Sequence, residues 1–498
     1  MSDKKMMNYK EGRPNILWIC TDSQRFDTLC CYGNDFVDTP NIDRLAEEGV
    51  LFENCFAQNP LCTPSRGNFL TGRYPVTNKL RQNGQDIQSD ETLITKILDE
   101  DDYVCGLSGK LHLSACDHRI KKFGKKGWYN IDDDAFYKGT EPRIDDGYSE
   151  FYWDHAASDH FDSSAYMHWL SEKGVEFKKS VRDDCEYVQH GMDSEHHQTT
   201  FCAEKAIDFI KRYGESIYPW LFSVNIFDPH FVLDPPDDYL EKYLDCLDEI
   251  PLPNYVEGEL ENKPPYQKKF HERQNYDQRT EKDHRMIKAA YWAMVEHIDT
   301  QVGRMLDALE ETGQKEDTIV IFTSDHGEML GDHGLYIKGP FLYDPAIQVP
   351  LIVSYPGTIE GGRRSSTLVE LGDLAPTIIE AAGMERHPGM QTKSFWSYIK
   401  KPGKLEDDFR DDVYCEYYNS NPNDPAQYCT MVRTQEYKLI NMHGQETGEL
   451  YDLKEDPGEN NNLWFSSEYQ EIKMKMLERM TDRMAMTADP LPERIGIY

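Results

Sequence analysis

The chain has 498 residues, a formal net charge of −35 and a pI near 4.8, which is long enough for a large domain plus a smaller one and too acidic to favour nucleic acids or acidic membranes. It has no apolar stretch of membrane-spanning length and no N-terminal export signal, so we expect a cytoplasmic protein without a membrane partner. The 12 cysteines are scattered without CxxC pairs, which argues against structural zinc and a disulfide framework.

The N-terminal part of the chain predicts alternating strands and helices. Residues 14–21 form a continuous apolar run that ends at Asp22, as is typical of a strand buried on both faces of a parallel sheet. Residues 41–48 predict a helix with Gly49 as its C-cap, and a second strand follows. This order is the β-α-β alternation of a parallel sheet.

The alternation returns in the second half of this region. Another buried strand leads into the Asp-Pro-His sequence that ends at His230. Residues 284–313 predict a long amphipathic helix, and the β-branched strand after it ends at Asp325. Residues 128–200 show little periodicity, so we expect a long excursion over the sheet, whose aromatic residues could line a specificity pocket or could serve packing or an oligomer contact.

The C-terminal part follows a different pattern. Short alternating strands and one amphipathic helix predict a smaller α+β unit. We therefore divide the chain into a catalytic α/β domain, residues 1–385, and a smaller domain, residues 386–498.

Several polar residues follow the predicted strands directly. Asp22, His230 and Asp325 each lie at a strand's carboxyl end, where open parallel sheets bind ligands. With Ser23 and His326, the two aspartates offer an oxygen-rich set suited to a hard divalent ion such as calcium, magnesium or manganese.

The stretch around Cys62 predicts an anion site at a helix N-terminus. Pro64 suits a first helical turn, so Cys62 is expected just before the helix, where free N–H groups favour an anion. Arg66 could bind two oxygens of that anion. A cysteine phosphatase needs its arginine six residues after the nucleophile, and Asn68 occupies that position, which argues against thiolate phosphatase chemistry.

The sequence CTPSRGNFLTGRYP, which begins at Cys62, resembles the signature of the type I sulfatases. In that family the cysteine is oxidised to formylglycine by a dedicated enzyme. The resemblance continues through GLSGKLHL, NIFDPHF and TSDHGEMLGDHGLYIKGP and covers nearly the whole chain. It implies an alkaline-phosphatase-like α/β fold, with a mostly parallel sheet and helices on both faces, plus a smaller C-terminal α+β domain with an antiparallel sheet.

The resemblance also implies a role for each matching residue. Formylglycine at position 62 would attack sulfur as its hydrate, and the chain would make transient contact with a formylglycine-generating enzyme. The implied catalytic residues are Cys62, Arg66, Lys110, His112, His230 and Lys338, with Asn83 as a substrate contact. The implied ligands of one divalent ion, with Ca²⁺ favoured over Mg²⁺ and Mn²⁺, are Asp22, Ser23, Cys62, Asp325 and His326.

The resemblance implies a separate role for each catalytic residue in the mechanism. Arg66 and the metal would stabilise the ionised hydrate, and Lys110 and Lys338 would hold sulfate oxygens. His112 would be the base that releases sulfate, and His230, alone or with Lys338, would protonate the leaving alcohol.

Two residues depart from the pattern of many sulfatases. Ser23 replaces a second acidic residue and His326 replaces an asparagine, as in the branch that includes phosphonate monoester and phosphodiester hydrolases along with some carbohydrate and choline sulfatases. We expect a sulfuric ester hydrolase acting on a small sulfated substrate, with a sulfated carbohydrate favoured. The alternatives are a phosphonate monoester or phosphodiester hydrolase with the same nucleophile, and a binding protein whose Cys62 is never oxidised; the oligomeric state stays open.

Overall fold

The computed structural model describes residues 10, 12–116, 141–156, 163–421 and 426–497. Parts of the predicted excursion, residues 128–140 and 157–162, lie outside the described residues. In the ranges that are described, no helix is both long and apolar enough to cross a membrane.

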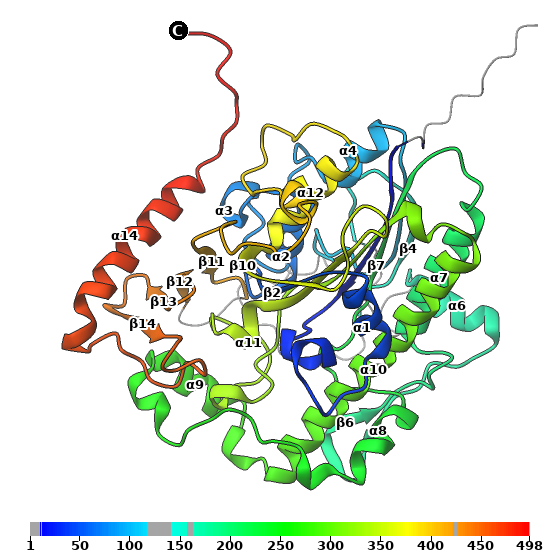
Figure 1. The fold of residues 1–498 in the computed structure, drawn as a ribbon. Helices are drawn as coiled ribbons and strands as arrows, with labels where there is room; N and C mark the ends of the chain where they lie inside the picture. Colours follow the sequence, from blue (N-terminus) through cyan, green and yellow to red (C-terminus); the bar gives the residue numbers. More distant parts are fainter. Residues whose placement is uncertain (1–9, 11, 117–140, 157–162, 422–425, 498) are drawn as a thin grey trace, which may run out of the picture.

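An eight-stranded sheet forms the centre of the molecule (Figure 1), in the order β10-β2-β9-β8-β1-β7-β3-β4. Its strands are β1 Asn15–Thr21, β2 Gly49–Phe56, β3 Val104–Gly109, β4 Tyr148–Trp153, β7 Trp220–Asn225, β8 Thr318–Ser324, β9 Gln348–Ser354 and β10 Arg363–Glu370. Strand β9 runs antiparallel to β2 and β8, and the other neighbours are parallel. The predicted fold, mostly parallel with helices on both faces, is confirmed.

Helices cover both faces of this sheet, which explains the continuous apolar run of β1. Leu17 and Ile19 pack in the core on one face, whereas Ile16 and Trp18 pack in the core on the other, because successive side chains of a strand point to opposite faces. The first face carries α1 Pro40–Glu47, α7 Gln198–Arg212 and α10 Glu281–Glu311. The second carries α2 Cys62–Thr71, α4 Ile94–Glu100 and α12 Leu374–Ala381.

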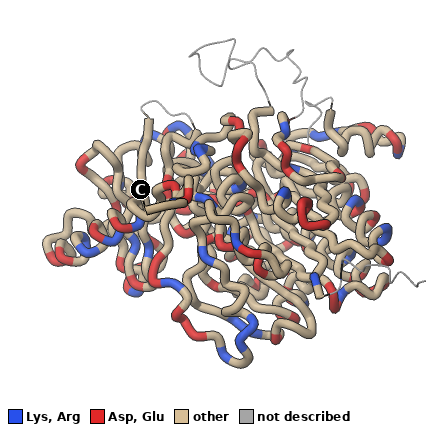
Figure 2. The backbone as a smooth tube through the Cα atoms, turned by 90° about the horizontal axis from the view of Figure 1, so that it is seen from above, with Lys and Arg blue, Asp and Glu red and all other residues tan. Residues whose placement is uncertain are grey.

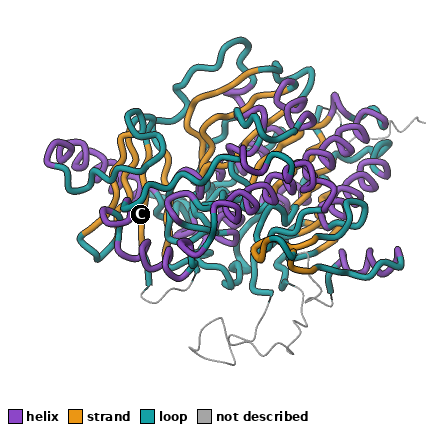
Figure 3. The backbone as a smooth tube through the Cα atoms, turned by 90° about the horizontal axis from the view of Figure 1, so that it is seen from below, coloured by secondary structure: helices purple, strands orange, loops and turns teal. Residues whose placement is uncertain are grey.

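A four-stranded antiparallel sheet follows in the C-terminal region, to one side of the large sheet (Figure 3). Its strands are β11 Val413–Tyr418, β12 Tyr428–Arg433, β13 Tyr437–Met442 and β14 Thr447–Asp452. Helix α14, Gln470–Met486, packs Met476 and Met480 against Val432 and Leu439 of this sheet. Phe395 and Ile399, which precede the sheet, instead pack in the core of the large sheet.

The remaining elements connect these layers. They are α3 Pro75–Asn78, α6 Ala165–Lys173, the hairpin of β5 Ser180–Arg182 and β6 Cys185–His190, α8 Asp237–Leu244, α9 Pro265–Arg273, α11 Asp344–Ile347 and α13 Trp396–Ile399. The described part of residues 128–200 thus holds an edge strand of the large sheet, β4, as well as α6 and the hairpin. Basic residues lie interspersed among the more numerous acidic ones (Figure 2).

The expected helix cap at Gly49 is wrong. Helix α1 ends at Glu47, and Gly49 is the first residue of β2. A Cβ atom at Gly49 would lie 2.4 Å from the carbonyl oxygen of Val353, so glycine is required there because β2 and β9 approach closely.

Candidate functional site

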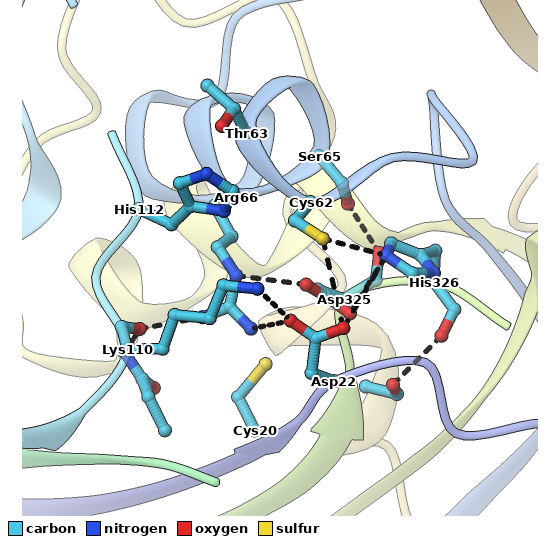
Figure 4. A network of polar contacts seen from close by, with 12 residues as sticks. Cys20, Asp22, Cys62, Thr63, Ser65, Arg66, Lys110, His112, Asp325 and His326 are labelled. Atoms are coloured by element: carbon cyan, nitrogen blue, oxygen red, sulfur yellow. Dashed lines mark hydrogen bonds and ion pairs between the residues drawn. The ribbon is translucent and has the colours of Figure 1, made fainter. Parts of the chain in front are cut away.

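Two neighbouring strands bring Asp22 and Asp325 together, as their positions in the sequence predict. Strands β1 and β8 pair in parallel, and each aspartate directly follows its strand. The Ser23 N–H donates to Asp325 Oδ1 at 3.1 Å, and the Ser23 hydroxyl donates to Asp22 Oδ1 at 2.9 Å. His326 lies beside both carboxylates (Figure 4).

Helix α2 presents Cys62 to this pair. Cys62 is the first residue of α2 and Leu61 is its N-cap, so the expectation that Cys62 precedes the helix is wrong by one position. The Cys62 side chain is buried, with Sγ 3.3 Å from His326 Nε2 and 3.8 Å from Asp22 Oδ1. A side chain there lies near the free N–H groups of the first helical turn.

Arg66 turns toward the two carboxylates from one helical turn further on. Its Nε donates to Asp325 Oδ2 at 2.9 Å, and its Nη2 lies 3.3 Å from Asp22 Oδ2. Its Nη1 donates to the carbonyl of Lys110 at 2.8 Å. The guanidinium is completely buried, so its first role in this structure is to compensate the charge of the two aspartates.

Two lysines complete a positively charged ring around Cys62 and Asp22. Lys110 Nζ lies 2.6 Å from Asp22 Oδ2. Lys338 Nζ lies 3.2 Å from Cys62 Sγ, 3.1 Å from Ser23 Oγ and 3.6 Å from Asp22 Oδ1. Any anionic group formed at residue 62 is therefore in contact with a cation.

The same residues fit a divalent cation. Single ligand atoms of Asp22, Cys62, Asp325 and His326 lie within 4.8 Å of one another, and all four side chains are buried. His326 Nδ1 lies 2.8 Å from the Gly327 carbonyl oxygen, so it donates there and leaves the lone pair of Nε2 facing the carboxylates, as metal-ligating histidines require. The two carboxylates make the set oxygen-rich, which favours a hard ion.

His230, His112 and Asn83 surround this centre in different ways. His230 Nε2 lies 4.0 Å from Asp22 Oδ1, and the His112 side chain interacts with that of Cys62. Asn83 Oδ1 accepts a hydrogen bond from the Thr63 N–H at 3.0 Å, so this side chain sits at the N-terminus of α2. All the residues predicted for the site thus converge on one place.

The charges around the site shift several pKa values. Burial and Asp22 oppose ionisation of the Cys62 thiol, but Lys110, Lys338 and His326 outweigh them and hold its pKa well below the ordinary value. Burial and Lys110 lower the pKa of His112 to about 4. Burial and Lys338 lower the pKa of His230. Both imidazoles are therefore neutral at pH 7 in the absence of an added anion.

Sequence reasoning missed Glu141, which holds the His112 loop in place. Its carboxylate accepts hydrogen bonds from the N–H groups of His112 at 2.7 Å and Ser114 at 2.9 Å, and from that of Leu113. The His112 ring also packs edge-on against His155, with the ring centroids 4.6 Å apart. Glu141 and His155 lie in the segment without clear periodicity, where no sequence pattern distinguishes them.

Comparisons with known proteins agree with this geometry. The profile of the Sulfatase family matches residues 14–384, and that of the C-terminal region of N-sulphoglucosamine sulphohydrolase matches residues 331–486. An N-acetylglucosamine-6-O-sulfatase of Bacteroides thetaiotaomicron is 26% identical to this chain and is matched over 97% of this chain and 88% of its own length.

Solved structures share the fold. The protein BT4656, in complex with its substrate D-glucosamine-2-N,6-O-disulfate, superposes with a TM-score of 0.73 at 24% identity, covering 97% of this chain and 100% of its own. A phosphonate monoester hydrolase from Silicibacter pomeroyi reaches a TM-score of 0.80 at 22% identity, covering 96% of both chains. With the family match over most of its length and the converging site, the chain belongs to the sulfatase family and is a sulfuric ester hydrolase.

Proposed function

We propose that this sulfatase hydrolyses a sulfate monoester of a carbohydrate, with formylglycine at position 62 as its nucleophile. The observation that carries the proposal is the placement of residue 62 at the N-terminus of α2, with Sγ 3.2 Å from Lys338 Nζ and 3.3 Å from His326 Nε2. A buried side chain in contact with a cation and an imidazole is suited to forming an anionic nucleophile.

A formylglycine would supply a hydrate with two hydroxyl groups, one to attack sulfur and one to release sulfate afterwards. Conversion of Cys62 requires contact with a formylglycine-generating enzyme. Asp22, Asp325, His326 and residue 62 would hold one divalent ion, with Ca²⁺ favoured, and Ser23 lies beside them. When bound, that ion would supply positive charge next to the nucleophile.

The chain's own residues then act on the substrate by charge and proton transfer. Lys110 and Lys338 bind sulfate oxygens, and Arg66 keeps the two aspartates in place while adding positive charge. His112 is neutral and can accept the proton whose loss releases sulfate. His230, alone or with Lys338, would protonate the leaving alcohol, and the charge of a bound sulfate favours a protonated His230. Asn83 would contact the substrate beside the N-terminus of α2.

A carbohydrate substrate is supported by the comparisons. A curated match is an N-acetylglucosamine-6-O-sulfatase, and a similar solved structure contains a sulfated glucosamine as its substrate. The test is hydrolysis of a panel of sugar, aryl and choline sulfates by protein that carries formylglycine at residue 62. We expect the highest kcat/KM on a sugar sulfate; modified protein that hydrolyses none of the panel would contradict the proposal.

A phosphonate monoester or phosphodiester hydrolase is the second candidate. Ser23 and His326 at the metal site favour it, and the fold superposes well on a phosphonate monoester hydrolase. Replacing a second acidic ligand by Ser23 leaves the site less negative, which suits a more highly charged transition state. Comparing kcat/KM for a sulfate ester and a phosphodiester with the same leaving group decides between the two.

A further inference from the structure

A second cluster of potential metal ligands lies outside the site described above. Single ligand atoms of His197, Asp228 and His297 lie within 4.8 Å of one another, and these residues are 2%, 1% and 0% exposed. His197 is the N-cap of α7, Asp228 follows β7, and His297 lies within α10. The cluster therefore connects three separate elements and shares no residue with the first site.

His297 carries an unused lone pair on one of its buried ring nitrogens. The Thr200 hydroxyl donates to the carbonyl of Ser194 at 2.5 Å, so its oxygen accepts the hydrogen of His297 Nε2, which lies 3.1 Å away. His297 Nδ1 has no hydrogen-bond partner within the described part of the chain. A charged form with an unpaired N–H would be costly at a fully buried position, so Nδ1 carries a free lone pair.

His197 faces Asp228 in a similar way. His197 Nε2 lies 3.3 Å from the carbonyl oxygen of Asp234 and donates to it. Among the residues that the structure describes, its Nδ1 accepts only a long 3.4 Å hydrogen bond, from the Thr199 N–H, and it lies 3.4 Å from Asp228 Oδ2. Two electron-rich atoms at this separation repel each other unless a proton or a metal ion lies between them.

The separation matches the ligand spacing of a metal ion. Two ligands of tetrahedral zinc, each about 2.0–2.1 Å from the ion, lie about 3.3 Å apart. Asp228 Oδ1 is also buried and has no hydrogen-bond partner among the residues described, although Thr199 Oγ1 donates to Oδ2 at 2.6 Å. The cluster therefore offers one unused lone pair on His297, one on His197 that accepts only a long hydrogen bond, and a free carboxylate oxygen.

We propose that His197, Asp228 and His297 bind a Zn²⁺ ion. Two imidazoles and one carboxylate favour zinc over the hard ions suited to the oxygen-rich site at Asp22. Each imidazole uses its second nitrogen to hydrogen-bond a carbonyl or hydroxyl oxygen, the arrangement that orients metal-ligating histidines. The ion joins α7 and α10 to the loop that carries His230, two residues after Asp228, so its role is to position that loop.

The test measures zinc directly, on tag-free protein. The first site could itself bind zinc through an unmodified thiol. All measurements therefore use a background variant in which that site is disabled by Cys62→Ser and Asp325→Asn. After chelation and dialysis against Zn²⁺, elemental analysis should find one zinc per chain. His297→Gln in this background should lose the ion, whereas His284→Gln should keep it, because His284 lies on the same helix and bonds Tyr336.

A spectroscopic measurement identifies the ligands if a variant folds poorly. Co²⁺ added to the background variant should give the visible absorption of nitrogen and oxygen ligands without thiolate charge transfer. Folded background variant that binds neither Zn²⁺ nor Co²⁺ stoichiometrically overturns the proposal and leaves a shared proton between His197 and Asp228. Zinc that persists in folded His297→Gln overturns it as well. Neither readout depends on hydrolysis of any substrate.

Discussion

Lys338 contacts three residues of the candidate site directly. Its ammonium group lies within 3.6 Å of Cys62, Ser23 and Asp22. Burial alone would lower its pKa, but the negative charges around it, with Cys62 and Asp22 foremost, raise the pKa above its ordinary value. In the proposed reaction, this ammonium group would supply a positive charge beside the transferring group.

Removing this charge should slow catalysis strongly. We predict that Lys338→Ala lowers kcat/KM about 10²–10³-fold, the range found when one group that stabilises a developing anion is removed. Steady-state kinetics on a sugar sulfate measures the effect. Lys173→Ala is the matched control, because Lys173 is a partly exposed lysine that pairs with Glu204 of α7 and contacts no residue predicted for the site. Activity of Lys338→Ala equal to that of this control would contradict the assigned role.

The contribution of His230 to kcat/KM should grow with the basicity of the leaving group. An alkoxide leaving group needs a proton, whereas an activated phenolate leaves without one. We predict that His230→Ala lowers kcat/KM much more for a sugar sulfate than for an activated aryl sulfate. Equal losses on both substrates would show that His230 acts in positioning or binding instead of protonation.

At the level of elements, Glu370 joins the large sheet to the C-terminal region. It ends β10, and its buried carboxylate accepts hydrogen bonds from Tyr74 Oη at 2.5 Å and from the Tyr414 N–H at 2.9 Å. It also forms ion pairs with Arg410 at 3.2 Å and with Arg483 of α14. One side chain thus fixes β10, β11 and α14 relative to one another.

Glu370→Gln should destabilise the protein substantially. Loss of one partner leaves buried guanidinium groups without full compensation, which costs about 3–5 kcal/mol. Urea unfolding measures the change in the free energy of unfolding. Lys475→Ala serves as the control, because its i,i+4 pair with Glu471 is exposed and should leave stability nearly unchanged. Similar unfolding curves for both variants would contradict the importance of Glu370.

The elements also show where sequence reasoning succeeds and fails. The strands that lead to Asp22 and Asp325 were predictable because both faces are buried, which leaves a continuous apolar run. The role of Gly49 could not be predicted from the sequence, because it depends on the close approach of Val353, 304 positions away. Glu141 was missed for the same reason, since its partners are backbone N–H groups of another segment.

At the scale of the whole molecule, the two sheets share a continuous interior. Phe56 and Leu61, which lead into α2, lie in the same apolar core as Val413, Met431 and Tyr451. Buried polar contacts cross this boundary too, among them the bond from Tyr343 Oη to Glu449 Oε2 at 2.5 Å. The C-terminal sheet therefore supports the segment that holds Cys62.

This shared interior predicts cooperative unfolding. Calorimetry of the full chain should show one main transition, coincident with the loss of near-ultraviolet and far-ultraviolet circular dichroism. Two well-separated transitions, with the C-terminal sheet melting first while the large sheet persists, would contradict this prediction. They would show that the contacts between the two sheets contribute little to the free energy of unfolding.

The central claim is that residue 62 becomes formylglycine and acts as the nucleophile. Its most direct test is mass spectrometry of the peptide containing residue 62, from protein made with and without a formylglycine-generating enzyme, alongside sulfatase activity. We predict a lower peptide mass, from replacement of the thiol by an aldehyde, and activity in proportion to the converted fraction. Full sulfatase activity with an unmodified Cys62 thiol would contradict the account.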